Sequence, residues 1–474
     1  MNRWARVSLK ILGGLVLGGG ALWASWAAFN NRFVDDAPRP VPEALRVPPA
    51  TLSAERNAMY ALLGMSAGGV DPQTAGLSRW ALIASGPSKP EEPASTLSWP
   101  GSGANGVAKA WNCDAQTEDC IAVWSREAEG LRSLLKAHAE IGQRCEAIAQ
   151  TGMAIEEPLI EPVAEPKTRG DLMVVRGFNF AWRPAFNCLR WLQVRSVLAS
   201  QAGDRAAMLG LVKQTDALTV AMLEGTRSLT GVTVAGSMAR RHWHLVTELA
   251  AHDPKAAPEL RAMLRPMSPR ATDVTRWIQT ESRFNRRVMK ELSCEDPNAD
   301  LKTLTLDSPV RCESRFWAMP NATQHLFDEQ WLQASALGAE GPLGLVDWKP
   351  NLESKMPLGL PRWRNSTGYF IAAVGMPGYV TYVRKQASVL LVNEAARVAL
   401  AAADIAPAQR ADWLKTQAMD ARLRERLSIV DGQVVARPWD PIEGRTELRY
   451  AIPSGVTSAG NLTGSRTDSS PPRS

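Results

Sequence analysis

Glu281 is the residue whose position is best suited to acid–base chemistry. In a helix of about 100° per residue, it falls in the middle of an apolar face. That face comprises Val274, Trp277, Ile278, Phe284 and Val288. A carboxylate there must be paired, be protonated or line a cavity, because burying it unpaired costs several kcal/mol. The structural interpretations are a buried pair with an arginine or a partly covered helix face; the functional interpretation is a general acid or base.

The same segment resembles a short catalytic motif. Glu281-Ser282-Arg283-Phe284-Asn285 is similar to the ESxFNP stretch of lytic transglycosylases, which cleave peptidoglycan with a single glutamate. Arg286 stands where that family has proline, and no GLMQ-like segment follows. The resemblance implies that Glu281 would serve as both acid and base. A peptidoglycan-acting enzyme is therefore the alternative function that the sequence offers.

His242 is the histidine best placed for a buried role. It shares a helical face with Val234, Met238, Leu245 and Leu249, whereas His244 points elsewhere. A lone imidazole on an apolar face is usually a hydrogen-bonded core residue, so we expect no metal site here. His242 is also a candidate partner for Glu281 if their helices pack together. No P-loop, HExxH or GxGxxG motif stands out, and we expect no cofactor.

The sequence contains 17 tryptophans and only 5 tyrosines. Their spread through predicted helices and loops favours core filling over an exposed cluster. Trp348 and Trp363 are the exceptions, because they lie at a long loop rich in proline and glycine. Exposed tryptophans stack on sugars or on partner surfaces, so these two are binding candidates.

All six cysteines lie beyond the apolar N-terminal segment, in a number that permits complete pairing. We expect neighbours to pair: Cys113 with Cys120, Cys294 with Cys312, and, by elimination, Cys145 with Cys188. A zinc site is the alternative, but there is no CxxC pair and no nearby histidine. The sequence therefore predicts structural disulfides and an oxidising compartment.

Residues 11–29 predict a membrane span. They carry no charge, follow Arg3, Arg6 and Lys10, and are long enough to cross the hydrocarbon core. The basic flank, residues 1–10, should stay in the cytoplasm, which places the body in the periplasm of a bacterium. The expected location is thus the inner membrane, with a single pass.

We expect this span to be a retained signal anchor. A cleaved signal is the alternative, since Ser25-Trp26-Ala27 satisfies the small-x-small rule. Gly14 and Gly18 have the GxxxG spacing that would allow two spans to pair as a homodimer.

The net charge of +6 excludes one class of partner. Half of it resides in the three basic residues before the span. The charge that remains on the body is too small to indicate nucleic-acid binding.

The rest of the chain divides into a linker, a body and a tail. Residues 30–50 are proline-rich and predict an extended linker that could hold the body off the membrane. Residues 51–456 form the body, with a sub-boundary near 338–366, and residues 457–474 predict a disordered tail.

Apolar residues at helical spacing dominate the body. They predict helices over residues 52–67, 123–149, 186–202, 205–224, 233–252, 272–292, 322–337, 378–403 and 408–427. Short breaks between them indicate antiparallel packing. Asp431-Gly432 predicts a hairpin turn between strands over 427–430 and 433–436, with a third strand over 448–452. The fold class is mainly α, an irregular antiparallel helical array with a small C-terminal hairpin or three-stranded sheet.

Two short runs resemble uncharacterised proteobacterial envelope proteins with one N-terminal transmembrane segment. They are residues 57–64, NAMYALLG, and residues 365–368 leading into Tyr379, Tyr382 and Arg384. The resemblance implies location and no activity. Together with the lack of a catalytic set, it favours a membrane-anchored binding, scaffold or accessory protein with an envelope protein as partner.

Overall fold

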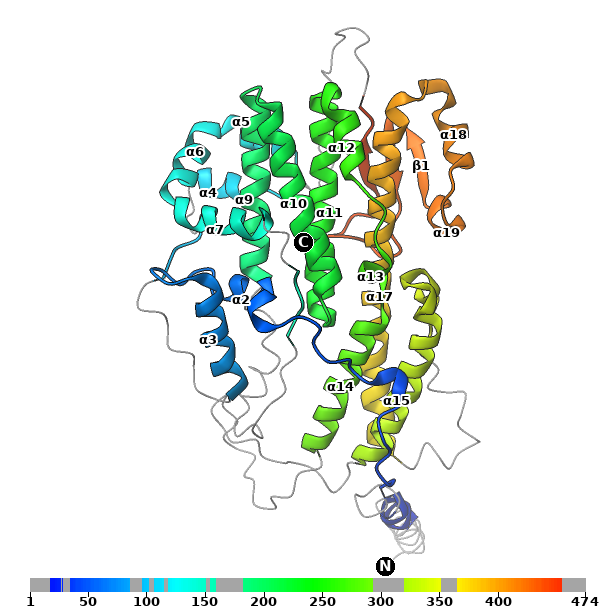
Figure 1. Cartoon of the computed structure of the whole chain (residues 1–474). Coiled ribbons are helices and arrows are strands. Elements are labelled where there is room, and N and C mark those ends of the chain that lie inside the picture. Colours follow the sequence, from blue (N-terminus) through cyan, green and yellow to red (C-terminus); the bar gives the residue numbers. More distant parts are fainter. Residues whose placement is uncertain are drawn as a thin grey trace, which may run out of the picture.

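The computed structural model describes residues 18–26, 28, 35–85, 96–101, 106–114, 118–150, 154–158, 182–292, 319–350 and 365–453. Over these residues the chain is mainly helical, with a small antiparallel sheet near its C-terminal end, as predicted (Figure 1). The α-helices are α2 (Ala58–Leu63), α3 (Pro72–Ser85), α4 (Gly106–Trp111), α5 (Cys120–Arg126), α6 (Ala128–Ala137), α7 (Ala139–Gln150), α9 (Trp182–Gln201), α10 (Arg205–Gly225), α11 (Leu229–His252), α12 (Ala257–Met263), α13 (Pro269–Thr272), α14 (Thr275–Leu292), α15 (Pro320–Leu337), α17 (Ser366–Ala401), α18 (Arg410–Thr416) and α19 (Ala421–Arg424). Short 3-10 helices are η2 (Glu43–Leu45), η3 (Ala54–Arg56), η4 (Pro254–Ala256), η6 (Gly338–Glu340), η7 (Pro342–Leu345), η8 (Ala402–Asp404) and η9 (Pro407–Gln409).

The long helices α9, α10, α11 and α17 stand side by side and form the centre of the array (Figure 1). Local sequence explains the turns between them. Gly203 has a φ of 74°, which glycine adopts without strain, and the Asp204 side chain accepts from Ala207 N–H to cap α10. Ser228 caps α11 in the same way through Gly231 N–H. These breaks fold each helix back on its predecessor.

Several predicted helices differ from the structure. Residues 52–67 form only η3 and the short α2. Residues 123–149 form α5, α6 and α7 rather than one helix, with breaks at Glu127 and His138. His138 leaves helical geometry where its Nδ1 lies 2.9 Å from Ser98 O. Residues 408–427 break between α18 and α19, where Asp420 caps a new turn. α17 begins twelve residues earlier than the predicted 378–403 and continues through Pro377, which lies on its exposed side.

The sheet comprises β1 (Leu427–Val430), β2 (Gln433–Ala436) and β3 (Leu448–Ala451) in the order β1-β2-β3. The hairpin prediction is confirmed: Val430 pairs with Gln433, and Asp431 and Gly432 both have positive φ, as a type I′ turn requires. β2 packs against α17 and β3 against α11. The sheet therefore closes one end of the helical array.

Tryptophans fill the core, as their dispersal predicts. A smaller apolar cluster lies among α14, α15 and the first half of α17. Its centre is Trp331, whose ring centroid lies 6.0 Å from Trp277 and 4.6 Å from Tyr379. A larger cluster is built on α9, α10, α11 and the second half of α17.

The described part of the linker, residues 35–50, runs along the body instead of holding it at a distance (Figure 1). Its backbone is largely extended, as the prolines predict. Leu45 is 1% exposed within the smaller core cluster. Asp35 accepts from the first amides of α15, and Arg227 Nη2 donates to Pro48 O at 2.5 Å. The predicted free spacer is therefore docked at both ends.

Of the predicted span, residues 18–26 and 28 are described, and they are helical and mostly exposed. Among the described helices, α10 alone has the length and apolar composition to cross a membrane. It packs between α9 and α11, as a core helix does. Residues 1–10 and 457–474 lie outside the described residues.

Candidate functional site

Glu281 lies at the meeting point of three helices. It projects from α14 toward the start of α11, where Leu229 N–H donates to Oε1 at 3.2 Å. The Tyr379 hydroxyl of α17 is its second hydrogen-bond partner. Of the two structural interpretations, the buried pair with an arginine is not what the structure shows: the N-terminal amide of α11 and a phenol are the partners, because α11 begins opposite the apolar face of α14.

Burial raises the pKa of the Glu281 carboxyl from 4.5 to about 7. The hydrogen bond from Leu229 N–H opposes this shift, and the neighbouring Glu157 carboxylate adds to it. Burial raises the pKa of Tyr379 as well, so its hydroxyl remains a donor. Glu281 is thus a carboxyl that can release or take up a proton near neutral pH, the property that acid–base catalysis requires.

Two further glutamates surround the start of α11, and the sequence analysis missed both. Glu157 is 3% exposed and accepts from Arg227 N–H and Ser228 N–H, each at 2.7 Å. Burial raises its pKa despite these donors. The signal was the adjacent pair Glu156-Glu157 in a proline-rich break, which composition alone assigns to a loop.

Glu156 has a structural role. Burial alone would raise its pKa, but hydrogen bonds from Leu52 N–H, Thr51 N–H and the Thr51 hydroxyl, together with Arg227, lower it. Arg227 Nη1 lies 3.1 Å from Glu156 Oε1, and both side chains are buried. The ion pair ties the extended segment 154–158 to the start of α11, and the hydrogen bonds from Thr51 and Leu52 tie it to the residues that follow the linker.

His242 is a core residue on α11. It is 2% exposed, and its Nε2 lies 3.4 Å from Asp216 Oδ1 of α10. Its predicted partnership with Glu281 is wrong, because Glu281 contacts the first residue of α11 and thirteen residues of helix, about 20 Å, separate that residue from His242. Among the described residues, no group of three His, Cys, Asp or Glu side chains could hold a metal ion.

Trp348 is not an exposed binding residue. It is 2% exposed, and its ring centroid lies 6.3 Å from Trp331 in the smaller core cluster. The loop prediction failed because η7 folds residues 342–345 back onto α15 and α17, which carries Trp348 inward. Trp363 lies outside the described residues.

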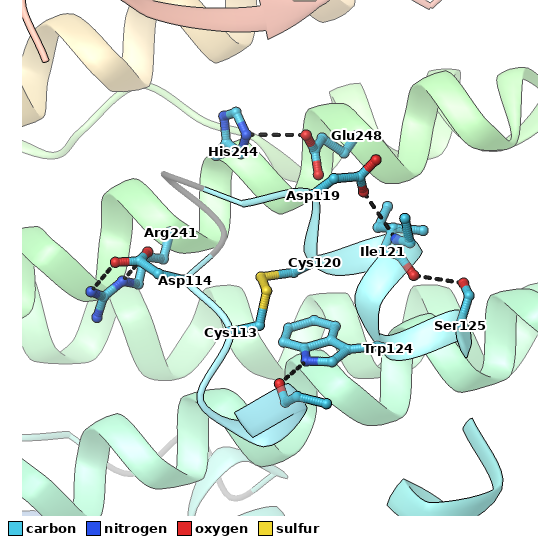
Figure 2. Close-up of a disulfide and its surroundings, with 12 residues drawn as sticks. Cys113, Asp114, Asp119, Cys120, Ile121, Trp124, Ser125, Arg241, His244 and Glu248 are labelled. Carbon is cyan, nitrogen blue, oxygen red and sulfur yellow. Dashed lines mark hydrogen bonds and ion pairs between the residues drawn. A yellow bond between two sulfur atoms is a disulfide. The ribbon is translucent and has the colours of Figure 1, made fainter. Parts of the chain in front are cut away.

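Two of the predicted disulfides are confirmed. Cys113 pairs with Cys120, and Cys145 of α7 pairs with Cys188 of α9. Figure 2 shows how the first bridge closes a loop whose Asp114 forms a two-pronged ion pair with Arg241 of α11. Cys294 and Cys312 lie outside the described residues. Disulfides of this kind are typical of chains that fold in an oxidising compartment.

The largest cavity among those we describe lies between α7, α10, α12 and α13 and has a volume of about 940 Å³. Sixteen of its 23 lining residues are apolar. The polar ones are Lys213, Asp216, Glu224, Glu259, Arg265, Ser268 and Arg270. Ligand sites have this combination of size, apolar wall and few polar groups. Nothing in the sequence pattern predicted it, because its wall is assembled from helices distant in the chain.

Searches against protein-family models, curated proteins and solved structures gave no match for this chain.

Proposed function

We propose that the chain binds an amphipathic small molecule in the periplasm as an accessory protein of the cell envelope, and that residues 11–29 anchor it in the bacterial inner membrane. The observation that carries this proposal is the cavity of about 940 Å³ between α7, α10, α12 and α13. The charge-free N-terminal segment supports the anchor, and the two disulfides support the periplasm.

The lining of the cavity defines the ligand class. Ala217 and Ala221 of α10 and Ala262 of α12 are small, so space remains between the helices for an apolar body. Met263 and Met267 add flexible walls that adapt to different shapes. The charged lining residues would hold a polar end group. An aliphatic or ring-containing molecule with one charged or polar end fits this arrangement.

The test is saturable binding of an environment-sensitive apolar dye, such as N-phenyl-1-naphthylamine, to the full chain in an uncharged detergent. We expect one site per chain and displacement by a single-chain amphiphile with a charged head. Trp243 lines the cavity, so its fluorescence should change with dye occupancy. A dye signal that never exceeds that of detergent alone contradicts the proposal.

The raised pKa of Glu281 supports a second candidate, a lytic transglycosylase-like enzyme that acts on peptidoglycan. The group has the protonation behaviour that its resemblance to that family implies. It lines neither of the two cavities we describe, so substrate access is the weak point of this candidate. Release of soluble fragments from purified murein by the wild type, lost in Glu281→Gln, would establish it. No release by the wild type would exclude it.

A further inference from the structure

A second, smaller cavity lies where the N-terminal segment meets α14 and α15. Its volume is about 190 Å³, and its lining comprises Pro38, Arg39, Arg286, Met289, Pro320, Asn321, Gln324 and His325. It is unrelated to the large cavity, with which it shares no residue. Its walls come from three parts of the chain, so the folded protein alone creates it.

The juxtamembrane residues are fixed onto this wall. Asp35 accepts from Asn321 N–H at 2.9 Å and from Ala322 N–H at 3.0 Å, which caps α15. Asp36 Oδ2 lies 3.2 Å from His325 Nδ1. The predicted span ends at residue 29, six residues before Asp35, and six extended residues reach at most about 21 Å. The cavity is therefore held close to the predicted membrane surface.

Buried polar atoms without hydrogen-bond partners gather in its lining. Gln324 and His325 are each 8% exposed. Gln324 Nε2 donates to Asp328 Oδ1 at 2.7 Å, which fixes the amide so that Oε1 has no partner. His325 Nε2 has none either. Buried polar groups are normally satisfied, so these atoms indicate a ligand.

Guanidinium groups complete the site. Arg286 Nη2 forms an ion pair with Asp328 Oδ1 at 2.5 Å, whereas its Nε has no hydrogen-bond partner. Arg39 is exposed and forms no ion pair with any described residue. The nearby carboxylates are already engaged: Asp35 with amides, Asp36 with His325, and Asp328 with Arg286 and Gln324. A ligand would thus meet free donors on two arginines.

We propose that this cavity binds a phosphate group that also offers a hydroxyl. The phosphate oxygens would accept from Arg39 and Arg286, because guanidinium groups match the geometry of phosphate. A hydroxyl would donate to Gln324 Oε1, which a bare anion cannot do. Hydrogen phosphate and the phosphoglycerol head of an anionic lipid both carry this chemistry. The position near the predicted span favours the lipid head.

The test measures binding by isothermal titration calorimetry, with the full chain in an uncharged detergent. The probes are inorganic phosphate, glycerophosphoglycerol as a soluble lipid head, and dimethyl phosphate, which has no hydroxyl. We expect saturable binding of at least one of the first two probes. The dissociation constant of dimethyl phosphate should be at least about tenfold higher. Tighter binding of glycerophosphoglycerol identifies a lipid head, and tighter binding of inorganic phosphate identifies the free ion. No saturable binding of either, or equal binding of dimethyl phosphate, overturns the proposal.

Matched variants locate the site. Arg39→Gln should weaken binding about tenfold, the effect of losing one charge-assisted hydrogen bond. Arg46→Gln is the control, because Arg46 is exposed on the same segment and does not line the cavity. Both positions are on the surface, so folding should be unchanged. Gln324→Met should remove the preference for the hydroxyl-bearing probe. Equal binding by Arg39→Gln and Arg46→Gln contradicts the assignment.

Discussion

Replacing Glu281 by glutamine should make the protein more stable at alkaline pH and leave its stability at acidic pH unchanged. The glutamine keeps an oxygen that can accept from Leu229 N–H and resembles the protonated carboxyl in shape. The major difference between the two proteins is that the Glu281 carboxyl of the wild type must release its proton as the pH rises, whereas the glutamine side chain cannot ionise. The variant therefore isolates the cost of ionising Glu281 in its buried position.

The magnitude follows from the pKa. Burial raises the Glu281 pKa from 4.5 to about 7, a shift that corresponds to about 3 kcal/mol. Between these two values the folded chain holds a proton that the unfolded chain has lost, so the free energy of unfolding falls as the pH rises. Below 4.5 both states are protonated, and above about 7 the full cost is present. The advantage of Glu281→Gln should grow from near zero to about 3 kcal/mol across that window.

The assay is urea unfolding of the full chain, followed by circular dichroism at several pH values from 4.5 to 8.5. Taking the difference between variant and wild type cancels most of the titration of other groups, such as Glu157. Glu129→Gln is the matched control, because Glu129 is exposed on α6. The free energy of unfolding of this variant should differ from that of the wild type by the same amount at every pH in this range. If the free energy of unfolding of Glu281→Gln differs from that of the wild type by the same amount at every pH, the reasoning is refuted. If this difference falls as the pH rises, Glu281 is instead a charged, paired carboxylate.

Three further predictions concern stability. Removing the Cys145–Cys188 bridge by a double alanine substitution should lower the free energy of unfolding in urea by about 4 kcal/mol, and removing the Cys113–Cys120 bridge in the same way by about 2.5 kcal/mol. The difference arises because the two bridges span 43 and 7 residues, respectively. The opposite order of costs contradicts the loop-entropy account. Gly76→Ala should lower the melting temperature and cost about 2–4 kcal/mol, since the new Cβ would lie 1.7 Å from Tyr60 O. Gly210→Ala is the control and should be neutral or slightly stabilising, because its Cβ meets nothing within 4 Å. Equal effects of the two substitutions would count against the close contact between α2 and α3. Asp35→Ala should remove the cap of α15 at about 1 kcal/mol and expose residues 35–50 to limited proteolysis, whereas an unchanged cleavage rate would show that the linker is held by other contacts.

The helical array and the hairpin could be predicted because their signals are local. Gly203-Asp204 ends one helix and caps the next, and Asp431-Gly432 accepts the positive φ of a two-residue turn. Helix bounds were less predictable where side chains override local preference. His138 leaves the helix where it meets Ser98 O, and α17 continues through Pro377 because its packing against α11 and α15 outweighs one lost hydrogen bond.

The environment of the candidate residues could be predicted only in part. The apolar face of α14 correctly placed Glu281 among buried residues, but its partners, Leu229 N–H and Tyr379, come from helices 52 and 98 positions away. The sequence places Trp348 at a loop, because it does not show that η7 turns this residue inward. Both cavities arise from residues far apart in the chain. Periodicity along one segment carries no information about such gaps.

The most direct test of the proposed function is the dissociation constant of the apolar dye for Ala221→Trp compared with Ala206→Trp. Ala221 lines the large cavity on α10, where a tryptophan would fill much of the space. Ala206 is exposed on the same helix and does not line it, so this variant controls for the added indole. We expect Ala221→Trp to weaken dye binding at least tenfold and Ala206→Trp to leave it unchanged. Equal affinity in the two variants would contradict a binding site between α7, α10, α12 and α13.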